Sequence, residues 1–307
     1  MASQSIMNIS LWLDFFQHFF WRPLLYRLPR KLAFKLAGAV NLKLALRFQR
    51  EEVSAYHQHL QVFYSVDKIT AWHWCCWNFR MLGREALDAY FLQRVNQAAD
   101  LDWVSLDEQC RTSFSALKTV DNGAIIIMAH YGRPILLSSY LGLHGCPVGM
   151  LSQPVDESNP HLNSAMRSFL QFKMRETVRL AGGRWLTLND SPLALARAIK
   201  AGQRMIIMLD LSEPDPTRQI TVPFGHGQLL LPPGIVRLAK QTNAKLFYAC
   251  AEDHGCRSVC RVTALSDSPD EAFAQAVSIF ENDCQAMPWE WWQWSNLPSL
   301  WSADNRP

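Results

Sequence analysis

The 307-residue sequence predicts an α/β fold, with a mainly parallel central sheet flanked by helices and an amino-terminal helical region that associates with a membrane. Three observations favour this fold. Hydrophobic residues make up 49% of the chain and charged residues 19%, which is enough apolar material for a full core and excludes a disordered chain. Beyond Asn122, short β-rich runs alternate with helical patterns. Two of these runs, at residues 123–129 and 205–209, are apolar throughout, as is typical of strands buried on both faces of a parallel sheet.

The first fifty residues are expected to form basic amphipathic helices that lie on a membrane surface. They hold eight of the 30 basic residues but one of the 27 acidic residues, so they carry a charge of +7, whereas the rest of the chain carries −4. If residues 23–48 form a helix, Arg27, Lys31 and Lys35 fall at i, i+4 and i+8, on one basic ridge beside an apolar face. An ordinary surface helix with a solvated charged face is the alternative.

The stretch before this helix favours the membrane interpretation. Residues from Ile6 to Phe20 are rich in aromatic side chains, and the chain holds 12 tryptophans in all. The stretch contains Asp14 and is shorter than the roughly 18–20 apolar residues that a spanning helix needs. We therefore expect a protein that lies on a bilayer without crossing it.

The remaining residues, 51–307, are expected to form one α/β domain with a helical lead-in to about residue 120. The expected strands cover residues 123–129, 147–151, 184–188, 204–209 and 245–251. The expected helices cover residues 160–180, 192–201, 235–242 and 269–285. Sites in parallel sheets gather at the carboxyl ends of the strands, so the residues that follow 123–129 and 204–209 are the first candidates for function.

Several functional classes are excluded by missing patterns. The net charge of +3 does not indicate a nucleic-acid partner. The sequence has no glycine-rich nucleotide loop and no G-x-S-x-G motif. Most of the eight cysteines lie in apolar runs, as buried reduced thiols do. His254, Cys256 and Cys260 have the residue types of a metal site, but the pattern favours a turn that runs into a strand, so no metal is predicted.

A series of short motifs resembles the late (lauroyl/myristoyl) acyltransferases of lipid A synthesis, in the lysophospholipid acyltransferase superfamily. The motifs are, in chain order, Trp21-Arg22-Pro23 through Leu42, Ala129-His130, Met208-Leu209-Asp210, Val222-Pro223-Phe224-Gly225, Pro233-Gly234 with the helix after it, and Met287-Pro288-Trp289-Glu290-Trp291-Trp292. The resemblance runs over most of the chain and depends on the order and spacing of the motifs.

This resemblance implies an acyltransferase on the cytoplasmic face of the inner membrane. Such an enzyme moves an acyl group from a thioester, on acyl carrier protein or coenzyme A, to a hydroxyl or amine, with His130 as the general base. No metal or cofactor is implied, since the thioester is a substrate. The resemblance also implies that Tyr131, Gly132, Arg133, Phe224 and Gly225 bind substrate. For Arg133, binding of a phosphate and a surface ion pair are both open.

The chain departs from the superfamily motif H-x4-D/E, because Ile135 stands where the acid that orients the histidine should be. The acid then comes from elsewhere, with Asp210 first and Glu213 and Asp215 next. Alternatively, His130 acts alone on an easier nucleophile such as an amine, or the catalytic site is lost and the protein only binds an acylated ligand.

A second departure concerns the acceptor. The family carries a basic residue before a proline in the loop after the second strand, and residues 157–161 have none. We therefore expect a specialised lipid or natural-product pathway, not the synthesis of lipid A. A non-catalytic acyl-chain or carrier-protein binding protein and a thioester hydrolase are the alternative functions.

Overall fold

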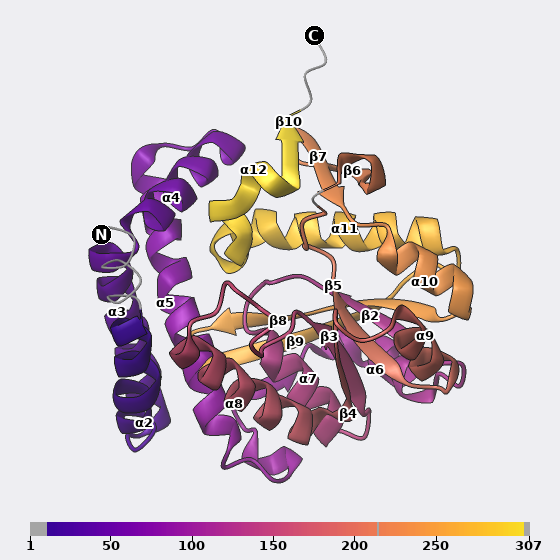
Figure 1. Cartoon of the computed structure of the whole chain (residues 1–307), viewed down its shortest axis with the longest axis horizontal. Coiled ribbons are helices and arrows are strands. Elements are labelled where there is room, and N and C mark those ends of the chain that lie inside the picture. The colour runs from indigo at the N-terminus through magenta and orange to yellow at the C-terminus, as the bar shows by residue number, and fades with distance from the viewer. Residues whose placement is uncertain (1–10, 214, 304–307) are drawn as a thin grey trace.

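A computed structural model describes residues 11–213 and 215–303 of the chain (Figure 1). Its centre is a seven-stranded sheet with the strand order β1-β9-β8-β2-β5-β3-β4. The strands are β1 (Val104–Leu106), β2 (Ala124–Met128), β3 (Val148–Ser152), β4 (Gly182–Thr187), β5 (Arg204–Met208), β8 (Lys245–His254) and β9 (Arg257–Ala264). Strands β8, β2, β5, β3 and β4 are parallel to one another, so the predicted α/β fold with a mainly parallel sheet is confirmed.

A strand was expected after the turn at His254, but its pairing and the second sheet of the structure were not predicted. Strand β9 runs antiparallel to β8 and pairs with the short β1 at the edge of the sheet. A second, antiparallel sheet contains β6 (Ile220–Phe224), β7 (Gly227–Leu231) and β10 (Trp301–Ala303). Both β9 and the second sheet alternate buried and more exposed residues, so they lack the continuous apolar pattern by which the central strands were recognised.

Helices cover both faces of the sheet, and every residue of β2 is therefore buried. Ile125 and Ile127 join the core under α9 (Pro192–Lys200), α10 (Gly234–Thr242) and α11 (Pro269–Ala286). Ile126 and Met128 join the core under α6 (Arg111–Thr119), α7 (Pro134–Leu143) and α8 (Ser164–Ala181). Figure 1 shows α11 on one side of the sheet and α7 and α8 on the other.

The amino-terminal helices differ from the single amphipathic helix that the sequence predicted. Pro29 separates α2 (Arg22–Leu25) from α3 (Arg30–Phe48), since the residue before a proline is disfavoured in a helical conformation. Arg27 lies in this connection, so the expected ridge on α3 is reduced to the exposed Lys31 and Lys35. A π-helical segment, η1 (Phe16–Trp21), comes before α2.

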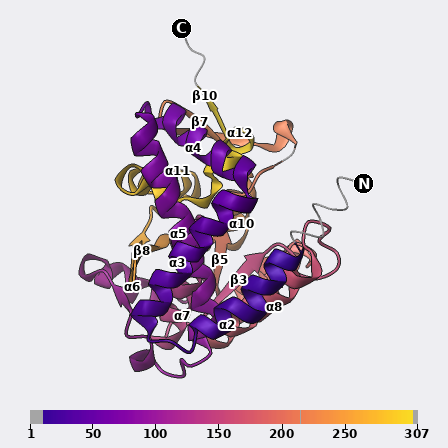
Figure 2. The same cartoon turned by 90° about the vertical axis from the view of Figure 1, so that its left-hand side faces the viewer.

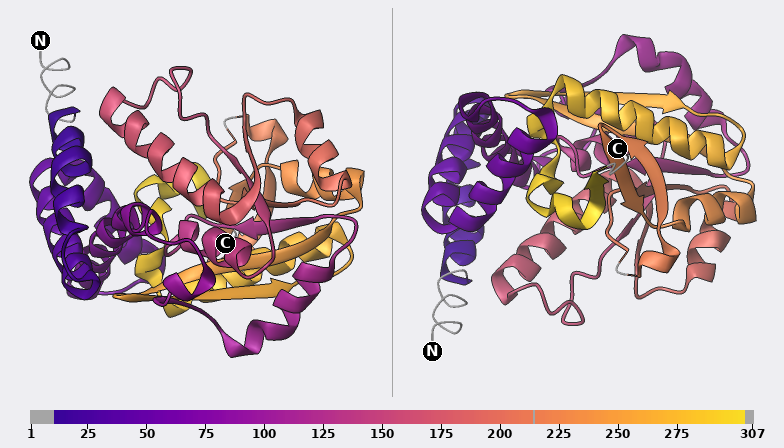
Figure 3. Two further views of the ribbon diagram at one scale, coloured as in Figure 1. Left: turned by 90° about the horizontal axis from the view of Figure 1, so that it is seen from below. Right: turned by 90° about the horizontal axis from the view of Figure 1, so that it is seen from above.

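Helix α3 packs closely along α5 (Lys68–Leu92), as Figure 2 shows. A side chain on Gly83 of α5 would come within 2.5 Å of the Ala37 carbonyl oxygen of α3, so the two helices approach at backbone distance. Phe34 and Ala37 are buried in the same core cluster as Phe91. Residues 30–48 are therefore part of the folded body, and the indigo helices in Figure 3 stand along one side of it.

The aromatic amino-terminal stretch lies outside this core. Residues 6–10 fall outside the described residues. Among those that follow, five aromatic side chains are between 45% and 71% exposed, namely Trp12, Phe15, Phe16, Phe19 and Phe20. Within residues 11–213 and 215–303, no helix combines the length and the apolar character that crossing a bilayer requires.

Candidate active site

The strand register of the sheet brings His130 and Asp210 together. Strands β2 and β5 pair in parallel, with Met128 opposite Met208, and the Leu209 N–H continues the ladder by donating to the Met128 carbonyl at 2.7 Å. His130 and Asp210 each lie two residues beyond this pair. They therefore meet at the carboxyl edge of the sheet, where parallel folds place their sites.

Asp210 is a buried carboxylate that accepts hydrogen bonds from three groups. The His130 backbone N–H lies 2.9 Å from Oδ2, the His130 Nδ1 lies 2.9 Å from Oδ1, and the Trp291 indole N–H lies 2.9 Å from Oδ2. Burial alone raises the pKa of a carboxyl group, but the charge of His130 and these donors outweigh burial and lower the pKa of Asp210. Asp210 is therefore an anion beside the histidine at neutral pH.

The same contact fixes the state of His130. Because the Asp210 carboxylate can only accept, Nδ1 must carry a proton, which leaves Nε2 as the basic nitrogen of the neutral ring. Burial lowers the pKa of His130, but the charge and hydrogen bond of Asp210 outweigh it and hold the pKa above the usual 6.5. The side chain is 26% exposed, so Nε2 is accessible to a bound molecule. This is the geometry of a general base with an orienting acid.

His130 lines an apolar cavity of about 260 Å³ between β2, β3, β5, α7 and α8. Ile135, at the position where the superfamily motif has its acid, is among the cavity-lining residues and adds to their apolar surface. The apolar residues are Met128, Pro134, Ile135, Met150, Leu151, Val155, Leu170, Met174, Leu188, Ile206, Ile207, Met208, Leu211 and Trp292. The polar residues are His130, Ser138, Ser152, Gln153, Lys173 and Thr177. A hydrophobic chain fits such a lining, with its polar end at His130.

The carboxy-terminal segment around η5 (Pro288–Glu290) and η6 (Trp292–Asn296) holds the His130 loop in place. The Trp292 N–H donates to the His130 carbonyl at 2.9 Å, and its indole N–H donates to the Gly132 carbonyl at 3.0 Å. The Gly132 N–H in turn donates to the Glu290 carbonyl at 2.9 Å. Together with Trp291 on Asp210, this segment fixes both members of the pair.

Arg133 does not reach the cavity, and the structure gives it a different role from the predicted substrate binding. Its guanidinium is completely buried and forms a two-pronged ion pair with Asp88 of α5, with Nε 2.7 Å from Oδ2. Its Nη1 reaches Asp253 and the Gly255 and Arg257 carbonyls. Because the guanidinium is sealed in the core, it is not accessible to a phosphate, and Arg133 ties the His130 loop to α5 and to the β8–β9 hairpin.

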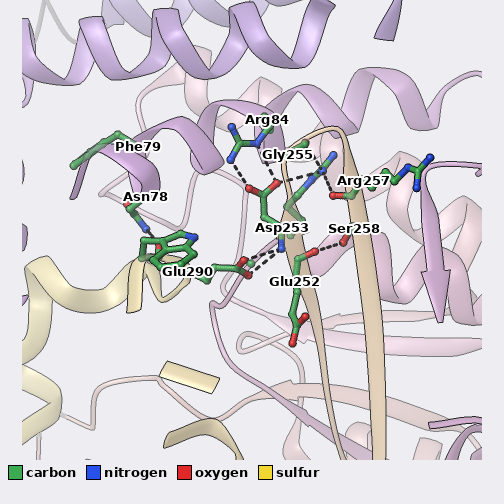
Figure 4. A network of polar contacts seen from close by, with 12 residues as sticks. Asn78, Phe79, Arg84, Glu252, Asp253, Gly255, Arg257, Ser258 and Glu290 are labelled. Atoms are coloured by element: carbon green, nitrogen blue, oxygen red, sulfur yellow. Dashed lines mark hydrogen bonds and ion pairs between the residues drawn. The ribbon is translucent and has the colours of Figure 1, made fainter. Parts of the chain in front are cut away.

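Asp253 and Glu290 extend this buried network (Figure 4). Arg84 of α5 donates to the Asp253 carboxylate, and both Glu290 side-chain oxygens accept the Asp253 N–H at 2.9 and 3.0 Å. Burial, together with the nearby Asp253, raises the pKa of Glu290 well above its usual value. Burial also raises the pKa of Asp88 to about 6, although Arg133 opposes the shift.

The other predicted substrate-binding residues also lie away from the cavity. Tyr131 is fully buried, with its hydroxyl donating to the Asp283 carbonyl at 3.0 Å. Gly132 has a φ of +62°, and a side chain there would come within 2.1 Å of the Ala251 carbonyl oxygen. Phe224 packs against Phe280 and Trp291 in the core under α11.

Gly225 is likewise structural, because the Phe63 ring covers it and its N–H donates to Glu281. Of the alternative acids for His130, Glu213 accepts the Asp215 N–H and Asp215 accepts from Thr217 within the same turn. Asp210 is thus the predicted acid that the structure brings to the histidine.

The cysteine and histidine cluster of the sequence lies on the β8–β9 hairpin. His254 contacts Glu252, Cys256 contacts the Lys31 carbonyl, and Cys260 is buried in the core. Among the described residues, no group of three or more histidine, cysteine or acidic side chains is arranged to hold a metal ion.

Comparison with known proteins adds no assignment: no protein-family model matches the chain, and no curated protein is significantly similar to it. The site therefore stands on its own geometry. Sequence reasoning missed three residues at this site, Lys173, Trp291 and Trp292. The sequence did offer a signal for Lys173. It lies four residues from both Phe169 and Thr177, on the buried face of α8, where a lysine is unusual.

Proposed function

We propose that the protein is an acyltransferase that moves an acyl group from a thioester to a hydroxyl or amine acceptor. The observation that carries this proposal is the His130–Asp210 pair at the edge of an apolar cavity. The cavity suits the acyl chain, and the pair suits removal of a proton from the acceptor. The sequence resemblance to the late acyltransferases of lipid A synthesis is consistent with the same chemistry.

In this mechanism the substrate thioester is carried by coenzyme A or an acyl carrier protein. The His130 Nε2 takes the proton of the acceptor as its oxygen or nitrogen attacks the thioester carbonyl carbon. Asp210 stabilises the imidazolium that forms, and the imidazolium returns the proton to the leaving thiolate. The superfamily acid missing at Ile135 is replaced by an acid from the neighbouring strand β5.

A peripheral position on an anionic membrane surface belongs to the same proposal. The exposed aromatic side chains of residues 12–20 provide apolar area, and the exposed Lys31 and Lys35 on α3 provide positive charge. A cleft nearby adds Arg27, Arg94 and Arg175 beside aromatic rings, and no acidic side chain lines it within the described residues.

Mass spectrometry of acyl transfer tests the proposal. Wild type and His130→Ala are incubated with acyl-coenzyme A and acyl-carrier thioesters of several chain lengths, each with lipid and amine acceptors. The expected result is loss of thioester and a new acylated product with wild type, and neither with His130→Ala. Thioester loss without an acylated product would identify a hydrolase instead.

A non-catalytic acyl-binding protein is the second candidate, and the strongly apolar lining of the cavity supports it. It predicts that no thioester is consumed, that acyl carriers still bind, and that His130→Ala binds them as tightly as wild type. The hydrogen bond of His130 with Asp210 favours the transferase, because a binding cavity has no need of a basic imidazole nitrogen.

A further inference from the structure

The proposed reaction places negative charge on the thioester carbonyl oxygen, and the backbone of the His130 loop has no donor left for it. The backbone N–H groups of residues 130–133 already donate, in order, to Asp210, to the Ala129 carbonyl, to the Glu290 carbonyl and to the Ala251 carbonyl. Pro134 has no N–H to offer. A donor for this oxygen must therefore come from another part of the cavity wall.

Most polar side chains of the cavity wall are also occupied. The Ser138 hydroxyl donates to the Ile135 carbonyl, the Ser152 hydroxyl to the Gln153 carbonyl, and the Thr177 hydroxyl to the Lys173 carbonyl. Gln153 is exposed, so its side-chain amide is solvated. Lys173 differs, because its ammonium has three N–H donors and a single hydrogen-bond partner among the described side chains, Glu85. Two donors remain for a bound molecule.

The position of Lys173 is costly for folding. Its side chain is 11% exposed, and Glu85 on α5, which pairs with it, is 5% exposed. The ammonium also lies 5.6 Å from the centre of the Trp292 ring, and the centre of that ring lies 5.7 Å from the centre of the His130 ring. A methionine or leucine at position 173 would fill the same space on the buried face of α8 without the desolvation cost of two buried charges. A buried charge that lines a cavity beside a basic histidine has the features of a functional residue.

We propose that Lys173 is a catalytic residue that binds the thioester carbonyl oxygen and stabilises the oxyanion formed on it, with Glu85 as its positioning residue. This inference rests on the proposed function. In the addition step, the acceptor atom forms a bond to the carbonyl carbon, the acceptor proton moves to His130, and the carbonyl π electrons move to the oxygen held by Lys173. In the collapse, the carbonyl re-forms, the C–S bond breaks, and the thiolate takes the proton from His130.

Steady-state transfer kinetics of Lys173→Met, Lys173→Arg and Glu85→Gln test the inference, with Lys240→Met as a matched control. Lys240 also forms an ion pair, but on the exposed surface with Asp270. Loss of one oxyanion donor typically lowers kcat about 10²–10³-fold. We expect this loss for Lys173→Met with KM changed less than threefold, partial recovery in Lys173→Arg, a smaller loss in Glu85→Gln, and wild-type rates in Lys240→Met.

The pH dependence tests whether the charge of Lys173 acts on His130, as an ammonium in the same cavity must. His130 faces three charges: Asp210 and Glu85 raise its pKa, and Lys173 lowers it. Removing the ammonium therefore raises the pKa of His130, and the acid limb of the rate profile of Lys173→Met should move to higher pH. The double variant Lys173→Met/Glu85→Gln avoids an unpaired buried carboxylate, so it keeps the test valid if the single variant does not fold.

The outcomes separate this inference from the proposed function. If wild type transfers acyl groups and folded Lys173→Met or the double variant does so at the wild-type rate, the inference is wrong and the transferase stands. A rise in KM with unchanged kcat would also overturn it, because Lys173 would then bind the ground state only. If wild type consumes no thioester, both fail together.

Discussion

His130 and Arg133 are three residues apart in one loop, and each pairs with a buried carboxylate, yet the two pairs have opposite environments. The His130–Asp210 pair borders the cavity and leaves Nε2 accessible, whereas the Arg133–Asp88 pair is sealed, with both side chains 0% exposed. The first pair contains a group that can change its charge near neutral pH, and the second contains a permanent cation. This difference favours the first pair as the place of the proposed chemistry and the second as structural support.

The largest effect is expected from a variant that breaks the His130–Asp210 pair. Asp210→Asn keeps the shape of the side chain but removes the charge that stabilises the imidazolium. We expect kcat for acyl transfer to fall about 10³–10⁴-fold, by analogy with the orienting aspartate of serine proteases. The unfolding free energy should fall by about 1–3 kcal/mol, because the amide NH2 faces a donor that the carboxylate had accepted. A loss below tenfold in steady-state assays would mean that His130 acts alone on an easy nucleophile.

Breaking the second pair should affect stability instead of chemistry. Arg133→Met leaves Asp88 buried without its cation, while Asp253 keeps Arg84, and an unpaired buried charge costs about 3–5 kcal/mol of unfolding free energy. Urea unfolding measures this, with Lys245→Met as the control, since the exposed pair of Lys245 with Asp267 contributes about 1 kcal/mol or less.

The same variant sharpens the comparison between the two pairs. Folded Arg133→Met should transfer acyl groups with an unchanged KM for the thioester. A strongly raised KM with unchanged stability would show that Arg133 binds substrate after all, as the sequence first suggested.

A smaller effect concerns the membrane surface. Lys31→Gln/Lys35→Gln should bind vesicles containing phosphatidylglycerol about 30-fold more weakly than wild type at low salt, because each lysine contributes about 1 kcal/mol near an anionic surface. The control Arg197→Gln/Lys200→Gln removes two exposed charges from α9, which lies far from α3 in Figure 1. Equal vesicle binding by both variants in sedimentation assays would argue against a membrane-facing α3.

The sequence predicted the parts of the molecule that depend on local pattern. The strand 124–128 is apolar at every position and the helix 192–200 begins with proline, so both were recognisable. Asp210 was placed beside His130 because parallel strands end at one edge of the sheet. The break at Pro29 was missed, because the basic spacing suggested one helix. A strand was expected after the turn at His254, but its antiparallel pairing with β8 was not.

The roles of the loop residues could not be predicted from the sequence. Whether Arg133 points into the cavity or into the core depends on Asp88 and Asp253, which lie 45 residues before it and 120 residues after it. The indole of Trp291 reaches Asp210 across 81 residues for the same reason, since tertiary packing sets which groups meet. Local sequence patterns hold no information about such pairings.

The pH–rate profile of single-turnover acyl transfer tests the His130–Asp210 pair most directly. The general base must be neutral, so the rate should rise with pH and reach half its maximum above pH 6.5, since Asp210 raises the pKa of His130. In Asp210→Asn the carboxylate no longer raises the pKa of His130, and burial lowers that pKa. The midpoint should therefore move to lower pH while the maximum rate falls. A midpoint that is the same in wild type and Asp210→Asn would contradict a catalytic pair.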